Sequence, residues 1–216
     1  MNHLLSDNDR ADLDKAIARV EELTSAQVVL AAVKKSDSYA EIPWKAFAVG
    51  VSVAGLALFL YDLFLPQWIT GIMILRHIAL ILAAGVLPAL MTLFFPPFAR
   101  LFLPGTRKET ETMQYAESLF LSHEIFATTG RKGVLLMVSR FEKQVVILPD
   151  KGLRDNLNEG VLKRIISRMS ENMRDKNIKK AFEDGLEELI KALADEDSMK
   201  PGRNELPDEI IEEEGE

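Results

Sequence analysis

AFAVGVSVAGLALFLYDLFL, residues 46–65, is the stretch that decides the fold, and IALILAAGVLPALMTLFF, residues 78–95, follows it closely. The hydrocarbon core of a bilayer is about 30 Å thick and needs roughly 20 helical residues to cross it. The first stretch has that length, with its only charge, Asp62, near the end, and the second is uncharged. We therefore predict a two-helix transmembrane hairpin at residues 44–98, with spans at about 46–65 and 76–97.

The basic residues around the hairpin predict its orientation. Only Arg76 lies in the connection between the spans, whereas six basic residues flank the hairpin: Lys34, Lys35, Lys45, Arg100, Arg107 and Lys108. Because Lys and Arg are enriched on the cytoplasmic side, we expect a multi-pass protein of the cell (inner) membrane with both termini in the cytoplasm. The opposite orientation is the alternative.

Two charges occur at similar depth on the far side of the hairpin. Asp62 ends the first span and Arg76 begins the second. Pairing across the hairpin would lower the cost of holding either charge at the membrane boundary. The alternative is that each side chain extends separately to the lipid headgroups.

Charge is distributed unevenly along the 216 residues. The segment from Glu205 to Glu216 has seven acidic residues and no basic one, so the remainder carries 26 basic and 26 acidic residues. A neutral body argues against nucleic-acid binding, which depends on neutralising phosphates. We expect residues 196–216 to be an acidic, disordered tail. The chain has no cysteine, which excludes disulfides and thiol catalysis.

The rest of the sequence predicts one soluble α/β domain in two parts, residues 1–43 and 99–195. Ser6 and Asp9 form a capping-box pattern that begins a helix over residues 7–24. Further helices are expected from Thr106 to about Thr128, from about Leu157, and after Asn177. Short apolar strands are expected at residues 26–33, 133–139 and 143–148. The first helix and strand are too little for a stable unit, so the core must combine both parts.

This order of elements resembles the TPM domain family. The resemblance rests on LSDNDRADLDKAIARVEELTSAQVVLAAV before the hairpin and on YAESLFLSHEIFATTGRKGVLLMVSRFEKQVVILPDKGL after it, and is strongest from Thr128 to Leu153. It implies a small mixed β-sheet sandwiched by helices, here interrupted by the transmembrane hairpin. Some relatives are associated with acid phosphatase activity, divalent-cation binding, or repair and regulation of membrane complexes. The usual layout is an exported domain with a C-terminal span, from which this chain departs.

Three side chains are candidates for chemistry. Asp150, in the turn Pro149-Asp150-Lys151-Gly152, and Asp155 shortly after it could begin a calcium or magnesium site, because hard cations take oxygen ligands. The alternative is that Asp150 caps its own turn. His123 could serve in acid–base chemistry, or it is a histidine at the edge of a packed helix face.

The sequence contains no catalytic constellation of the familiar kinds. We therefore expect a membrane-tethered interaction or accessory module for a partner in or at the membrane, with no catalysis. The alternative is a weak metal-assisted acid phosphatase that depends on Asp150 and Asp155.

Overall fold

The computed structural model describes residues 4–65, 68, 70–174, 177–194 and 210–215. The chain divides into two compact units, each described by itself. The first combines Met1–Ser38 with Lys108–Glu216, and the second is Tyr39–Arg107. One folded unit is therefore assembled from both sides of the apolar segment, as the shortness of the N-terminal part requires.

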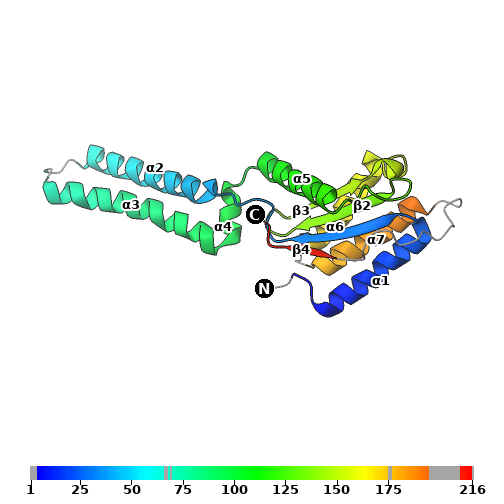
Figure 1. The fold of residues 1–216 in the computed structure, drawn as a ribbon. Coiled ribbons are helices and arrows are strands. Elements are labelled where there is room, and N and C mark those ends of the chain that lie inside the picture. The colour runs from blue at the N-terminus through cyan, green and yellow to red at the C-terminus, as the bar shows by residue number, and fades with distance from the viewer. Residues whose placement is uncertain (1–3, 66–67, 69, 175–176, 195–209, 216) are drawn as a thin grey trace. The chain divides into compact units, whose positions relative to one another are not determined.

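The first unit is built on a sheet of four described strands with helices on both faces (Figure 1). Its strands are β1 (Gln27–Val33), β2 (Gly133–Ser139), β3 (Gln144–Pro149) and β4 (Ile211–Glu213). Its helices are α1 (Asp7–Thr24), α5 (Gly105–Ser122), α6 (Glu159–Arg174) and α7 (Ile178–Leu193), with a short 3₁₀ turn η2 (Lys151–Leu153). The predicted α/β class, a small mixed sheet between helices, is confirmed.

The strand order is β3-β2-β1-β4. β1 and β2 run parallel along seven residues each, with Gln27 opposite Gly133 and Val33 opposite Ser139. β2 and β3 pair antiparallel through the short turn between them. The central pairing of the sheet thus joins residues that lie about a hundred positions apart in the sequence.

Alternate residues of the strands enter two separate apolar cores, as the period of two dictates. Val28, Leu30 and Ala32 of β1 face α1, α6 and α7, whereas Val29 and Ala31 face α5. All seven residues of β1 are buried because both faces of the strand are covered. This explains why β1 reads as a continuous apolar run and does not alternate with polar residues.

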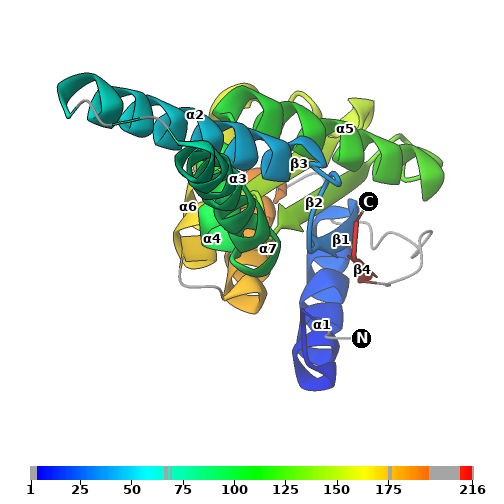
Figure 2. The ribbon, with the colours of Figure 1, turned by 90° about the vertical axis from the view of Figure 1, so that its left-hand side faces the viewer.

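The acidic tail departs from the expected disorder at its end. Ile211–Glu213 forms β4, which pairs parallel with Ala31–Val33 of β1 (Figure 2). Ile210 and Ile211 are buried, one in each core. The two isoleucines interrupt the acidic run and supply the apolar surface that a solvated tail lacks. Most of the predicted tail, residues 195–209, lies outside the described residues.

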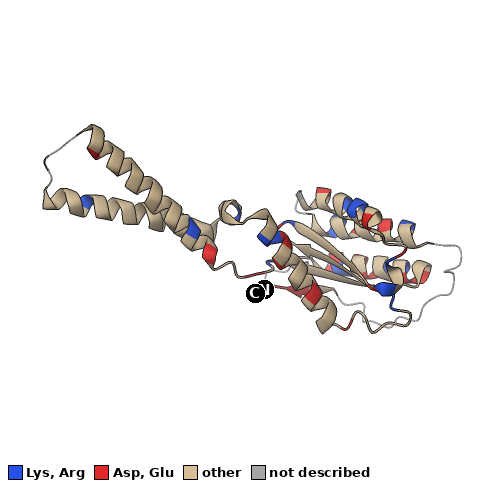
Figure 3. Ribbon diagram, turned by 90° about the horizontal axis from the view of Figure 1, so that it is seen from above, with Lys and Arg blue, Asp and Glu red and all other residues tan. Residues whose placement is uncertain are grey.

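The second unit consists of two long apolar helices followed by short helical turns. α2 (Glu41–Phe64) and α3 (Gly71–Phe94) have 24 residues each, and α4 (Pro96–Ala99) and the 3₁₀ turn η1 (Arg100–Phe102) follow. Charges are sparse on both long helices (Figure 3). Their apolar side chains are largely exposed. In the most apolar 18 residues of each helix, 0% of the residues are buried in α2 and 11% in α3. Both are long and apolar enough to cross a membrane.

α2 and α3 approach each other closely where glycines lie. A Cβ on Gly50 would be 2.1 Å from the Ala84 carbonyl oxygen, and one on Gly85 would meet Val51 and Phe47 within 2.8 Å. Small residues permit such helix contacts in lipid, where no hydrophobic force draws helices together. The contact between the two helices therefore depends on these two positions.

Candidate functional site

The predicted cation ligand Asp150 lies at the end of β3, where it caps the η2 turn. Its Oδ1 accepts a hydrogen bond from Lys151 N at 2.7 Å and from Arg131 Nη2 at 3.0 Å, and its Oδ2 lies 2.7 Å from Arg131 Nε. The carboxylate is buried, whereas the Arg131 side chain is half exposed. The guanidinium thus donates a hydrogen bond to Oδ1 and lies within ion-pair distance of Oδ2, which is buried and accepts no hydrogen bond within the described residues. A bound cation would have to displace Arg131.

The other two candidate side chains are both exposed. Asp155 is exposed just after η2, and His123 is exposed in the turn that follows α5. Within the described ranges, no three or more His, Asp or Glu side chains gather as ligands for a metal ion. The calcium or magnesium site at Asp150 and Asp155 therefore stays a prediction.

The polar pair predicted in the hairpin has a different described contact. His77 Nδ1 lies 3.5 Å from Asp62 Oδ2, one residue beyond Arg76. A pairing of Asp62 with Arg76 stays a prediction, and the geometry adds His77 as the neighbour that the carboxylate faces. The local sequence does not favour His77 over Arg76, although a one-residue step moves a side chain about 100° around a helix.

A buried polar cluster lies at the carboxyl ends of β1 and β2, and the sequence analysis did not identify it. Glu142 is only 1% exposed. Its Oε1 accepts from Ser36 N at 2.9 Å, and its Oε2 accepts from the Ser139 hydroxyl. The Ser36 and Ser139 hydroxyl oxygens lie 3.2 Å apart. A serine at the end of each buried strand was the available signal. The cluster ties the two strands together out of reach of solvent.

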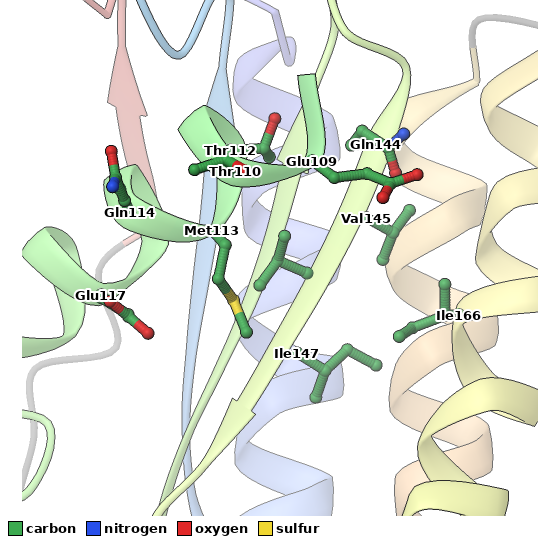
Figure 4. Close-up of a pocket in the computed structure, with 11 residues that line it drawn as sticks. Glu109, Thr110, Thr112, Met113, Gln114, Glu117, Gln144, Val145, Ile147 and Ile166 are labelled. Atoms are coloured by element: carbon green, nitrogen blue, oxygen red, sulfur yellow. The ribbon is translucent and has the colours of Figure 1, made fainter. Parts of the chain in front are cut away.

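A groove of about 540 Å³ lies between α5, β3 and α6 (Figure 4). Val145 and Ile147 of β3 and Ile166 of α6 provide its apolar lining, and Met113 of α5, 43% exposed, extends over it. Glu109 and Glu117 of α5 add carboxylates to its lining. An apolar groove with a few polar groups is the usual form of a binding site.

Sequence reasoning missed this groove because no single element carries it. Each lining residue fits an amphipathic helix or an edge strand when read locally. Only the pairing of β3 with β2 places α5 and α6 on opposite faces of the sheet, leaving the space beside β3. Since β3 is an edge strand of the described sheet, the groove lies where an extended peptide could add to it.

Comparisons with known proteins agree with this architecture. Residues 100–192 match the family model of the TPM domain. The fold is similar to the NMR structure of the BA42 protein from the psychrophilic bacterium Bizionia argentinensis sp. nov.. The TM-score is 0.56 at 16% identity, over 98% of this chain and 97% of that one. Among curated proteins, none matches.

Residues 100–192 thus match the family that the sequence resemblance predicted. The matched segment begins after the two apolar helices and includes β2, β3, α6 and most of α7. β1 and α1, which complete the core, lie outside it.

Proposed function

We propose that this chain is a multi-pass protein of the cell (inner) membrane that presents its TPM domain in the cytoplasm as an interaction or accessory module. The exposed apolar surface of α2 and α3 supports the membrane part of the proposal. A 24-residue helix is about 36 Å long, enough to cross the hydrocarbon core. A helix in the core of a soluble protein would instead bury such side chains.

The groove beside β3 carries the interaction part of the proposal. It combines an apolar lining with the carboxylates of Glu109 and Glu117, and Met113 offers an adaptable contact surface. This chemistry fits an extended segment of a membrane protein that has both apolar and basic residues. Pairing with the edge of β3 would add backbone hydrogen bonds to the side-chain contacts.

Site-specific photocrosslinking in intact cells tests this role. A photoreactive residue replaces Met113, and a matched variant carries it at Lys163, which is exposed on α6 and absent from the groove lining. We expect one discrete membrane-protein adduct from position 113 and none from position 163. Equal labelling at both positions would contradict a role for the groove.

Cysteine labelling tests the proposed orientation. Because the chain has no cysteine of its own, an introduced cysteine is the only thiol in it. Single cysteines are placed at Trp68, between the two long helices, and at Lys163. A membrane-impermeant thiol reagent added outside the cell should label position 68 only. Labelling of position 163 by the same reagent would reverse the orientation.

The alternative function is a weak, metal-assisted acid phosphatase. One observation favours it: the half-exposed guanidinium of Arg131 next to Asp150 could bind a phosphoryl group. The test is hydrolysis of an aryl phosphate with added Mg²⁺ or Ca²⁺, compared with Asp150→Asn and Arg131→Met. Turnover that both substitutions abolish in folded protein would replace the accessory role by the enzymatic one.

A further inference from the structure

The opposite edge of the sheet, beside β1, holds the chain's own C-terminal segment in a way that resembles a bound peptide. Ile210 enters the core under α1, and Ile211 enters the core under α5. Lys34 N donates to the Glu213 carbonyl oxygen at 3.1 Å, which continues the ladder one residue past the end of β1. Residues 210–215 are separated from the end of α7 by 16 residues.

Each acidic side chain of this segment has its own recognition group. Glu212 accepts from Leu5 N at 3.1 Å and from Leu4 N at 3.3 Å, and its Oε2 lies 2.8 Å from Arg10 Nη2. Glu213 accepts from the Tyr115 hydroxyl. Glu214 pairs with the Lys34 ammonium, which lowers the pKa of that carboxyl. The segment is therefore held by contacts to its acidic side chains as well as by backbone hydrogen bonds.

The position of Gly215 adds a further selective element. Its φ is +81°, and a Cβ there would lie 1.5 Å from the Lys35 carbonyl oxygen. Only glycine fits such a backbone and such a contact. The edge therefore reads a pattern of two apolar residues, three acidic residues and a glycine.

The intramolecular strand occupies the edge only partly. β4 pairs with three of the seven residues of β1, whereas β2 pairs with all seven. Farther along the same strand, Val28 N donates to the buried Glu21 carboxylate at 3.0 Å. A ladder of three pairs is short, and an edge strand is a ready template for another chain. These three pairs are all that a competing strand would have to replace in the ladder.

We propose that the β1 edge is a strand-accepting site for an extended segment of another protein that carries this apolar–acidic–glycine pattern, and that Ile210–Gly215 is its intramolecular occupant. The proposal goes beyond the interaction role of the groove, because it concerns a different surface with the opposite charge preference. Arg10 and Lys34 select an acidic partner, whereas Glu109 and Glu117 select a basic one.

The test uses the full chain in detergent and a fluorescein-labelled peptide of residues 208–216, DEIIEEEGE. In the double variant Ile210→Asn/Ile211→Asn the intramolecular strand is disabled. We expect this variant to bind the peptide at least tenfold more tightly than the unmodified chain, because the competitor is gone. A scrambled peptide of the same composition should bind neither protein.

A charge swap assigns the binding to the β1 edge. Adding Arg10→Glu to the double variant should weaken binding at least tenfold, and a peptide with Glu212→Arg should restore it. If the double variant does not unfold cooperatively, the single variant Glu212→Lys takes its place, since it keeps both isoleucines. Failure of a folded variant to distinguish the true peptide from the scrambled one would overturn the proposal.

Two further outcomes are informative. If isotope-labelled copies exchange β4 and form a dimer, the β1 edge binds a second copy of this chain. That result would overturn the proposal that it binds another protein. If the photoreactive residue at position 113 gives a specific adduct but the peptide does not bind, the proposed role of the groove stands. The proposal of a strand-accepting site at the β1 edge is then wrong.

Discussion

The two units of this chain place apolar side chains in opposite positions. In the first unit, Met1–Ser38 with Lys108–Glu216, which contains most of the segment that matches the TPM family model and is called the TPM unit, apolar residues from four helices and four described strands are buried on the two faces of the sheet. In the second or helical unit, Tyr39–Arg107, α2 and α3 meet closely at Gly50 and Gly85 and expose most of their apolar residues. Hydrophobic burial therefore stabilises the first unit, whereas it contributes little to the second, whose apolar side chains are mostly exposed.

A phenylalanine from each unit gives the largest expected contrast. Phe182 of α7 is fully buried, and Phe59 of α2 is 62% exposed. Phe182→Ala should lower the free energy of unfolding of the TPM unit by about 3–5 kcal/mol, and Phe59→Ala should change it by less than about 0.5 kcal/mol. Amide hydrogen exchange in β2 measures the free energy of unfolding of the TPM unit. Tryptophan fluorescence would not report on it, because both tryptophans lie in the helical unit. Equal effects would remove the contrast.

A carboxylate from each unit gives the next contrast. Glu142→Ala leaves Ser36 N and the Ser139 hydroxyl without their acceptor inside the protein, which should cost about 2–4 kcal/mol. Asp62→Ala, at a half-exposed position of α2, should leave the TPM unit unchanged. Glu142→Gln retains one acceptor and should cost less than Glu142→Ala. Denaturant titration, monitored by amide hydrogen exchange in β1, measures the destabilisation. It should be largest for Glu142→Ala, smaller for Glu142→Gln and absent for Asp62→Ala.

Glycine substitutions probe the contact between the two apolar helices. Gly50→Leu should increase the distance between the axes of α2 and α3 by about 2 Å. Distances between packed helix axes range over about 8–10 Å with the size of the side chains at the contact. Gly55→Leu is the matched control, since a Cβ at Gly55 meets nothing within 4 Å. Spin labels on engineered cysteines, one in each helix, report the separation. No change with Gly50→Leu would mean that the close approach is not what holds the pair.

The smallest expected effect concerns an exposed ion cluster of the TPM unit. A hydrogen bond from the Ser6 hydroxyl mainly lowers the pKa of Asp9, a hydrogen bond from Lys179 lowers that of Asp12, and the same pairing raises the pKa of Lys179. The stability from the two aspartates is present above the pKa of unfolded Asp, about 3.9, and is lost as pH falls through their lower folded values. The lysine contribution is lost as pH rises through its raised value.

Lys179→Met should therefore flatten the acid side of the stability profile, mostly below about pH 4. The shift in Tm at neutral pH should be less than about 3 °C, because exposed pairs contribute little. Lys180→Met, which removes the neighbouring lysine of the same helix, is the control. Identical pH profiles for the two variants would rule out a role of the cluster in acid stability.

The sequence predicted the local elements well, because their signals are local. The Ser6–Asp9 capping box and the Asn177 cap both form where expected. The helix expected to run to Thr128 ends at Ser122, because Glu124 adopts φ +50° and turns the chain so that Ile125 packs against Gly133.

Long-range features could not be predicted in the same way. β4 has three residues, and its partner β1 lies almost 180 positions earlier in the chain. Neither composition nor periodicity indicates that pairing, since the surrounding residues are acidic. The burial of Glu142 and the groove beside β3 likewise depend on which strands become neighbours.

The separation of β1 from β2 in the sequence has a consequence for synthesis. At about 5–20 residues per second, the ribosome needs several seconds to tens of seconds to make the roughly hundred residues between Val33 and Gly133. For that interval the nascent β1, an apolar strand, has neither of its eventual neighbours. Exposed apolar strands favour aggregation, so slower synthesis of the residues between Val33 and Gly133 should raise the fraction of chains that aggregate before release.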